Sequence, residues 1–337
     1  MSGRSPRSGE AGAERRQAYR LPPVRQAADG RVRTVGFELE FSGLTLDATA
    51  AAVRHALGGE IHRVSAAERR VHSAELGEFN IEIDWAYLKQ AAGEDGDDSE
   101  WLERLSELAS LLVPIEVVCP PVALDRLEAL DAMVAALRAA GAVGTEESLI
   151  AAYGVHINAQ IPSLDAATLD AYLKAFALLQ WWLVDAHRVD PARRLSPYID
   201  LYAEDYVRRV LTREAPTLDE LFDDYLAFNP DRNRALDLLP LLAEIDRERV
   251  RRAVDDPRVK ARPTFHYRLP NCHIERAGWS LAESWNTWCV VEALAAQPAA
   301  LRELGAAFLG AARPLLGVSR ADWVARIDRW LGDHESA

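Results

Sequence analysis

Residues 36–41 read GFELEF, and the alternation of this stretch decides the fold that we expect for the chain. Successive side chains of a β-strand point to opposite faces, so the three apolar residues share one face, and Glu38 and Glu40 share the other. A strand with one apolar and one charged face is typical of an antiparallel sheet that is covered on one side only. The stretch therefore predicts a sheet with helices on its apolar face and carboxylates on its open face.

Four further stretches show the same period-two alternation. They read FNIEIDW at residues 79–85, PIEVVCPP at 114–121, YGVHINAQIP at 153–162 and TFHYRLPN at 264–271. Shorter strands are expected at Glu60–Val64 and Arg69–Ser73. The polar positions of the four longer stretches are Glu82, Asp84, Glu116, His156, Asn158, His266 and Arg268. An ordinary solvated strand face mixes threonine, serine, lysine, arginine and glutamate, so this set is unusually rich in carboxylate and imidazole groups.

Helical periodicity dominates the second half of the chain. Thr45 is a candidate N-cap for a first helix at Leu46–Leu57, and the sequence TLDE from Thr217 is a capping-box pattern. The other expected helices are Ala123–Ala140, Asp165–Val189, Thr217–Phe228, Ala235–Val254 with a break at Pro240, Ala282–Ala296, Leu301–Leu309 and Arg320–Leu331. The expected fold class is α+β: a mainly antiparallel curved sheet with a polar active face, helices on its other face, and a largely helical C-terminal half.

The charge balance restricts the classes of partner. The 337 residues include 39 lysines and arginines against 52 aspartates and glutamates, which gives a formal net charge of −13. The first 35 residues hold eight arginines and only three acids, so the remainder is more acidic still. Such a body repels nucleic-acid phosphates, and we expect no nucleic-acid partner. No stretch approaches the roughly 20 apolar residues of a membrane span, so no membrane partner is expected either.

The N-terminal residues and the cysteines indicate the compartment and the domain boundaries. The first 20 residues contain no apolar segment, so we expect no secretory signal. The chain has three cysteines and no Cys-x-x-Cys pair, which argues against a disulfide framework. We therefore expect a cytoplasmic protein. Residues 1–30 are expected to form a disordered basic leader, and residues 31–337 a single domain. The sequence does not indicate an oligomeric state.

Carboxylates gathered on one sheet face point to bound cations. They would repel one another and raise their own pKa values unless cations neutralise them. A set of carboxylate oxygens with one imidazole favours Mg²⁺ or Mn²⁺ over zinc, and such ions usually bind substrate phosphates as well. An arginine beside them, such as Arg268, suits phosphoryl transfer, in which charge develops on phosphate oxygens.

In order and spacing, these motifs resemble the amidoligases of the carboxylate–amine ligase superfamily. The resemblance rests on GFELEF, IEIDW, the Glu-x-x-x-Pro-Pro pattern from Glu116, the Gly-x-His-x-Asn pattern from Gly154, and a late strand with a Tyr-Arg pair. It covers roughly residues 35–288. It implies a domain with the glutamine synthetase and glutamate–cysteine ligase fold, and an ATP- and Mg²⁺-dependent ligase that joins a carboxylate to an amine through an acyl phosphate.

The resemblance also implies roles for single residues. Glu38, Glu40, Glu116 and His156 match the family's metal-binding positions. Asp84 lies where the family lines the substrate pocket, and we expect it to act as the general base. Arg268 matches the arginine that contacts the transferred phosphoryl group, and the expected ATP-binding set is Arg268, His266 and Asn158. The implied substrates are a small-molecule or peptide carboxylate and an amine.

One departure from the family pattern leaves alternatives open. The late strand of the family usually reads Glu-x-Arg, whereas here it reads His266-Tyr267-Arg268. A histidine lacks the negative charge of a glutamate. The replacement is therefore expected to reduce the number of bound metals or the affinity at the second metal position. The alternatives are a catalytically inactive ligase fold that acts as a binding protein, and a metal-dependent hydrolase that uses the same carboxylates without nucleotide.

Overall fold

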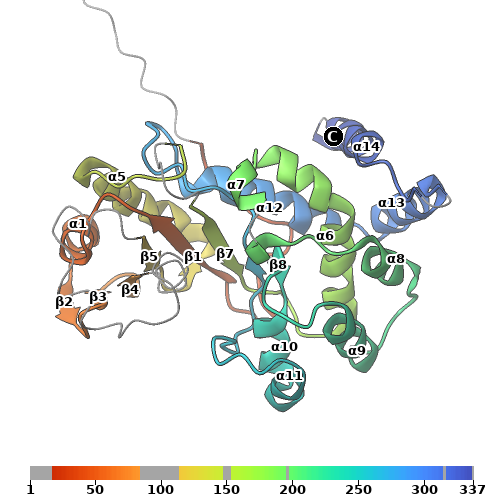
Figure 1. Cartoon of the computed structure of the whole chain (residues 1–337), viewed down its shortest axis with the longest axis horizontal. Helices are drawn as coiled ribbons and strands as arrows, with labels where there is room; N and C mark the ends of the chain where they lie inside the picture. The colour runs from red at the N-terminus through yellow and green to blue at the C-terminus, as the bar shows by residue number, and fades with distance from the viewer. Residues whose placement is uncertain (1–16, 84–113, 147–152, 195–196, 314–315, 336–337) are drawn as a thin grey trace, which may run out of the picture.

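The computed structural model describes residues 17–83, 114–146, 153–194, 197–313 and 316–335. Its centre is an antiparallel sheet of nine strands, eight of them in the order β2-β3-β4-β5-β1-β7-β9-β8, with β6 paired to the start of β1 (Figure 1). The strands are β1 Thr34–Phe41, β2 Glu60–Arg63, β3 Glu68–Ser73, β4 Gly77–Ile83, β5 Ile115–Val118, β6 Val122–Ala123, β7 Val155–Ala159, β8 Leu236–Asp237 and β9 His266–Tyr267. The predicted α+β class is confirmed.

Two helices cover the apolar face of the first strands. The helix α1 (Leu46–Leu57) contacts β2, β3 and β4, and it packs on α5 (Asp131–Ala140). The predicted N-cap is confirmed, because the Thr45 side chain accepts a hydrogen bond from the Ala48 amide at 3.2 Å. Phe37, Leu39 and Phe41 of β1 are fully buried, whereas the two glutamates between them are only partly buried. The alternation of GFELEF therefore separates a core face from an open face.

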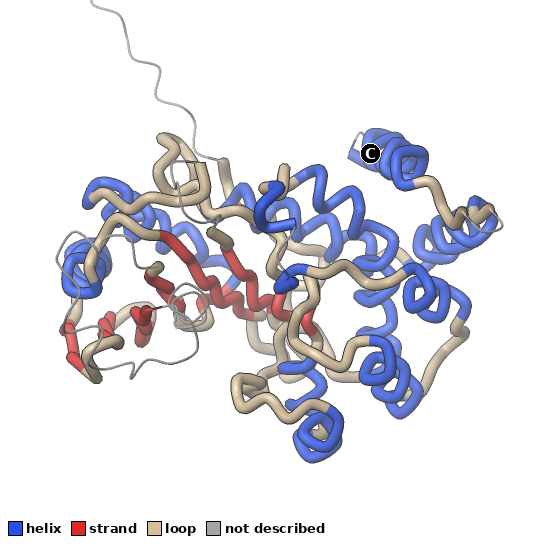
Figure 2. Tube along the Cα trace, in the orientation of Figure 1, coloured by secondary structure: helices blue, strands red, loops and turns tan. Residues whose placement is uncertain are grey.

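Helices fill the C-terminal half, while most of the strands gather on the other side of the molecule (Figure 2). The long helix α6 (Ala166–Ala186) packs on α12 (Leu281–Ala295), and both contact the apolar side of the late strand. There Tyr267 lies 5.0 Å from the ring centre of Trp288 and 6.1 Å from that of Phe176. The other helices are α7 Pro191–Arg194, α8 Glu204–Thr212, α9 Leu218–Phe228, α10 Leu239–Ile245, α11 Arg247–Ala253, α13 Pro298–Ala311 and α14 Arg320–Glu335. Short 3₁₀ turns lie at Leu124–Leu130 and Pro197–Ile199.

A buried ion pair joins the first strand to the C-terminal helices. Arg33, immediately before β1, contacts Glu292 of α12 through both terminal nitrogens, at 2.9 and 2.7 Å. Both side chains are about 1% exposed. Glu292 also accepts hydrogen bonds from Tyr172 of α6 and from the Trp288 indole. A buried charge is tolerated only when its hydrogen-bonding capacity is met, and here four hydrogen bonds from three residues meet that of Glu292.

Two predicted helices differ from the structure. Residues 235–254 were expected to be one interrupted helix, but Leu236–Asp237 form the edge strand β8, and Pro240 lies in the first turn of α10. A proline is favourable there, because the amide hydrogen that it lacks would have no partner in the first turn of a helix. Residues 123–130 form the end of β6 and a 3₁₀ turn, and the α-helix begins only at Asp131.

The described part of the N-terminal segment is attached to the body. Asn286 of α12 accepts a hydrogen bond from the Arg20 amide at 2.7 Å and donates one to the Ala18 carbonyl at 2.8 Å. The Tyr19 hydroxyl donates to Asp131 at 2.8 Å. Residues 18–20 therefore contact the body, while the first 16 residues of the leader expected over residues 1–30 lie outside the described residues. Among the described residues, no helix is long and apolar enough to cross a membrane.

Candidate functional site

The open face of the sheet carries a row of acidic and imidazole side chains. Glu38 and Glu40 both reach this face because they are two residues apart on β1. The pairing register places Glu38 opposite His156 of β7, although 118 residues separate them. The same register places Glu40 opposite Glu116 of β5, and Glu116 opposite Glu82 of β4. Antiparallel pairing thus brings the separate sequence motifs onto one surface.

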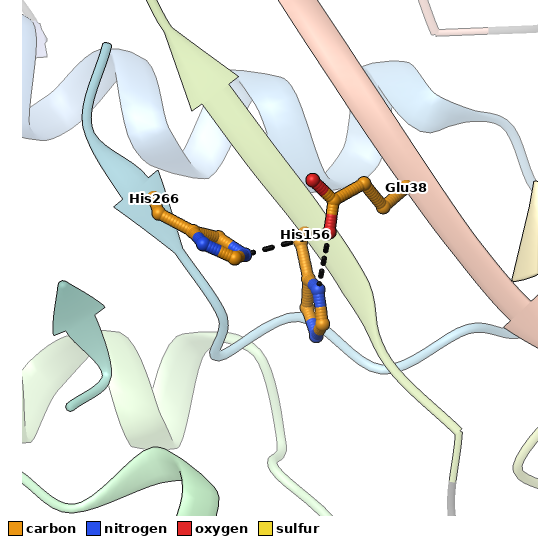
Figure 3. Close-up of side chains that lie close together, drawn as sticks. All are labelled: Glu38, His156 and His266. Atoms are coloured by element: carbon orange, nitrogen blue, oxygen red, sulfur yellow. Dashed lines mark hydrogen bonds and ion pairs between the residues drawn. The ribbon is translucent and has the colours of Figure 1, made fainter. Parts of the chain in front are cut away.

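Glu38 lies between two imidazoles at the centre of this face (Figure 3). Its Oε2 atom is 3.0 Å from His156 Nδ1 and 3.5 Å from His266 Nε2. Its Oε1 atom accepts a hydrogen bond from the Asn158 amide at 2.9 Å. Three strands, β1, β7 and β9, therefore position the groups around one carboxylate. Both imidazoles and the amide are at least nine-tenths buried.

Glu40 faces the other nitrogen of the same imidazole. Its Oε1 atom lies 3.4 Å from His156 Nε2, and its Oε2 atom accepts a hydrogen bond from the Gly154 amide at 2.7 Å. The Oε1 atom of Glu116 lies 4.0 Å from His156 Nδ1, the nitrogen that faces Glu38. A side chain at position 154 would lie 2.6 Å from the Arg193 guanidinium, so glycine at that position allows the close approach. A carboxylate facing the Nε2 atom requires a proton or a cation between the two groups.

Arginines border the acidic cluster on the side of β9. Arg268 approaches Asp237 of β8 and the Nδ1 atom of His266, at 3.5 and 3.4 Å. Arg262 donates to the Asn158 carbonyl oxygen at 2.8 Å and approaches the same His266 nitrogen at 3.3 Å. Because the guanidinium fixes which end of the Asn158 amide is the acceptor, it also directs the amide nitrogen toward Glu38.

The surroundings set the charge of the central groups. Burial favours the protonated form of Glu38, but His266 and His156 outweigh burial and hold the pKa of this carboxyl well below its usual value. Burial and the neighbouring Arg268 lower the pKa of His266 well below its usual value. Burial raises the pKa of Asp237, and burial lowers the pKa of Arg262. The surroundings therefore favour the ionised form of the Glu38 carboxylate and the neutral form of the His266 imidazole.

The donor set fits a hard divalent cation. Among the described residues, two groups of side chains have ligand atoms within 4.8 Å of one another: Glu38 with His156 and His266, and Glu40 with Glu116 and His156. The second group offers two carboxylates and one imidazole, which suits Mg²⁺ or Mn²⁺. No cysteine belongs to either group, and all three cysteines are buried.

The structure brings most of the predicted site residues together. Glu38, Glu40, Glu116, His156, Asn158, His266 and Arg268 lie on one face of the sheet. Asp84, the expected general base, lies outside the described residues. Sequence reasoning missed Arg262, Asp237 and Arg193. The alternation of the late strand, extended back from His266 by four residues, was the available signal for Arg262. Asp237 was missed because its strand was read as a helix.

Comparison with protein families identifies the family of the chain. A family model described as "Putative amidoligase enzyme" matches residues 31–290 of the chain. The chain belongs to this amidoligase family. No curated protein and no solved structure matches it. An amidoligase is a ligase-type enzyme that forms a carbon–nitrogen bond, and the matched range includes every residue of the cluster from Glu38 to Arg268.

Proposed function

We propose that this amidoligase joins a carboxylate to an amine at the expense of ATP, with Mg²⁺ or Mn²⁺ as the cation. The observation that carries the proposal is one sheet face on which a cluster of carboxylates lies beside buried arginines. The cluster consists of Glu38, Glu40, Glu116 and His156, and Arg268 lies next to it behind His266. A cation cluster and a guanidinium side by side provide the two kinds of positive charge that a polyphosphate and a transferring phosphoryl group require.

The first step is phosphoryl transfer to the substrate carboxylate. A carboxylate oxygen attacks the γ-phosphorus, the bond from that phosphorus to the β–γ bridging oxygen breaks, and ADP leaves. A divalent cation, when bound, supplies charge that offsets the repulsion between the carboxylate and the triphosphate. Arg268 stabilises the charge on the transferring group, because a guanidinium presents several hydrogen-bond donors in a planar fork. His266 and Asn158, the other expected ATP-binding residues, support these groups through their hydrogen bonds.

The second step forms the amide. The amine nitrogen attacks the carbonyl carbon of the acyl phosphate, the bond from that carbon to the phosphate oxygen breaks, and inorganic phosphate leaves. The amine loses a proton in this step, and we propose Asp84 as the base that takes it. The substrates are a small-molecule or peptide carboxylate and an amine.

The test is release of ADP from Mg²⁺-ATP in the presence of pooled carboxylates and amines. We expect ADP release that depends on both pools and on the cation. The substitution Glu38→Gln should reduce it at least about a hundredfold, because it removes the charge at the centre of the cluster. The control Glu78→Gln changes an exposed carboxylate of β4 and should leave the rate unchanged.

Each of the other outcomes would support a different function. Full activity of Glu38→Gln would refute the assignment of the cluster. Binding of Mn²⁺ with hydrolysis of an amide or ester, and no ADP release with any pair of substrates, would indicate the metal-dependent hydrolase. No metal-dependent ATP binding in a thermal-shift assay would indicate an inactive ligase fold that acts as a binding protein.

A further inference from the structure

The two candidate ligand groups compete for one imidazole. His156 belongs to both, with its Nδ1 atom toward Glu38 and its Nε2 atom toward Glu40. A neutral imidazole has one lone pair and one N–H group, so it ligates a cation through one nitrogen and donates a hydrogen bond through the other. The hydrogen bonds around the two histidines therefore decide how many cations the cluster holds.

The surroundings of His266 place its proton on the wrong nitrogen for a ligand. Its Nδ1 atom faces Arg262 at 3.3 Å and Arg268 at 3.4 Å. A guanidinium has only donors, so this nitrogen accepts, and the ring proton lies on Nε2. The Nε2 atom lies 3.5 Å from Glu38 and has no hydrogen-bond partner among the described residues, so its N–H group faces the carboxylate without a formed hydrogen bond. A metal-ligating histidine has the opposite arrangement, with its far nitrogen donating to an acceptor.

His156 has the arrangement that His266 lacks. Its Nδ1 atom lies 3.0 Å from Glu38 Oε2, so the ring donates its N–H to a carboxylate. Its Nε2 lone pair then points toward Glu40, 3.4 Å away, in the group that also contains Glu116. A carboxylate behind the ring fixes its tautomer and orientation, as in many protein metal sites.

The Glu38 carboxylate already accepts hydrogen bonds from its neighbours. It receives hydrogen bonds from His156 and Asn158, and the His266 Nε2 atom lies 3.5 Å from it. Arg262 in turn holds Asn158 by its carbonyl oxygen. The carboxylate thus has two hydrogen-bond donors of its own, with His266 Nε2 beside them, before any cation enters.

We infer that the cluster holds a single divalent cation, on Glu40, Glu116 and His156, and that Glu38 and His266 support this position without forming a second one. The inference rests on the proposal that the cluster binds a divalent cation. It assigns His266, which stands where the family usually has a glutamate, the role of a positioning residue that closes the second position with an N–H group.

The test is the number of Mn²⁺ ions bound by the full chain without nucleotide. Equilibrium dialysis should give one ion per chain, and electron paramagnetic resonance should show an isolated ion. The substitution His266→Glu provides a carboxylate at the second position, so we expect two ions per chain and the broadened spectrum of a coupled pair. The control His72→Glu adds a carboxylate on exposed β3 and should leave one ion.

Nitrogen NMR of histidine-labelled protein tests the tautomer independently. The His266 resonances, assigned by their loss in His266→Gln, should show a protonated Nε2 atom and an unprotonated Nδ1 atom. Two ions in the unaltered chain, one ion in His266→Glu, or a proton on Nδ1 would each overturn the inference. Absence of ADP release with one bound ion would instead refute the proposed reaction and leave the inference intact.

Discussion

At the scale of single residues, the late strand carries different chemistry on its two faces. His266 and Arg268 reach the polar face, and Tyr267 between them packs on the aromatic core. The Tyr267 hydroxyl lies 2.7 Å from His187 Nε2, at the C-terminal end of α6. Burial, with Arg193 nearby, lowers the pKa of His187 to about 3. This imidazole therefore stays neutral in the folded chain well below its usual titration range.

His187 makes stability depend on pH. Unfolded, it takes up a proton near pH 6.5, whereas in the folded chain it does so only near pH 3. Between these values the unfolded chain binds more protons, so stability falls as the pH falls. His187 should contribute about 2 kcal/mol to the loss of stability from pH 7 to pH 5, and His187→Gln should remove that contribution. Urea unfolding of both proteins at the two pH values measures this difference.

The matched control for this prediction is His72→Gln, which removes an exposed imidazole. This variant should lose as much stability between pH 7 and pH 5 as the unaltered protein. An unchanged pH dependence in His187→Gln would mean that other groups cause it.

Residues of the site differ in how far the sequence could predict them. Glu38, Glu40 and His156 follow directly from alternation, because a strand fixes which side chains share a face. Arg262 continues the alternation of β9, past Pro263, and a longer window would have included it. Arg193 had no such signal: it comes from the short helix α7 and donates to the carbonyl groups of Arg268, Leu269 and Pro270. Only the tertiary structure brings a residue of this kind to the site.

At the scale of elements, the capping residues at helix ends predicted secondary structure more reliably than apolar composition did. Thr217 and Glu220 form a capping box, and α9 begins at the residue after Thr217, as the TLDE pattern predicts. By contrast, the leucine-rich segment from Ala235 is buried on all sides, and its periodicity does not separate a strand from a helix. The edge strand Leu236–Asp237 was therefore missed, and with it the carboxylate opposite His266.

The turn between α1 and β2 shows why its two glycines are not equivalent. Both have positive φ, +70° at Gly58 and +97° at Gly59. A Cβ atom at Gly58 would meet nothing within 4 Å, whereas one at Gly59 would lie 2.0 Å from the His72 carbonyl oxygen. Gly58→Ala should cost about 1 kcal/mol from backbone strain alone. Gly59→Ala should cost about 3 kcal/mol or more, because the clash involves β3.

Denaturant unfolding of the two alanine variants checks this prediction, and each glycine is the control for the other. Equal losses would show that the backbone of β3 moves to accept the methyl group. A larger loss for Gly58→Ala would contradict the geometry of the turn.

At the scale of the whole molecule, the N-terminal segment is tied to a helix near the other end of the chain. Asn286 holds Ala18 and Arg20 by two hydrogen bonds, worth about 1 kcal/mol each. Asn286→Ala should raise the rate at which trypsin cleaves native protein after Arg20 about tenfold, because the segment opens more often. Mass spectrometry of the early fragments identifies the cleavage site.

The neighbouring substitution Thr287→Ala is the control, since within the described part of the chain the Thr287 hydroxyl donates to the Glu283 carbonyl of its own helix. This variant should be cleaved at the rate of the unaltered protein. Equal rates in all three proteins would show that other contacts hold the segment.

The ion pair of Arg33 and Glu292 has a consequence for folding during synthesis on the ribosome. The partners are 259 residues apart in the chain. At 5 to 20 residues per second, a ribosome needs roughly 10 to 50 seconds to make the second after the first. During that time the central strand β1 has been synthesised without the helix that anchors it. The last steps of folding therefore occur only after Glu292 has been synthesised. Until then β1 is an apolar strand to which a chaperone can bind.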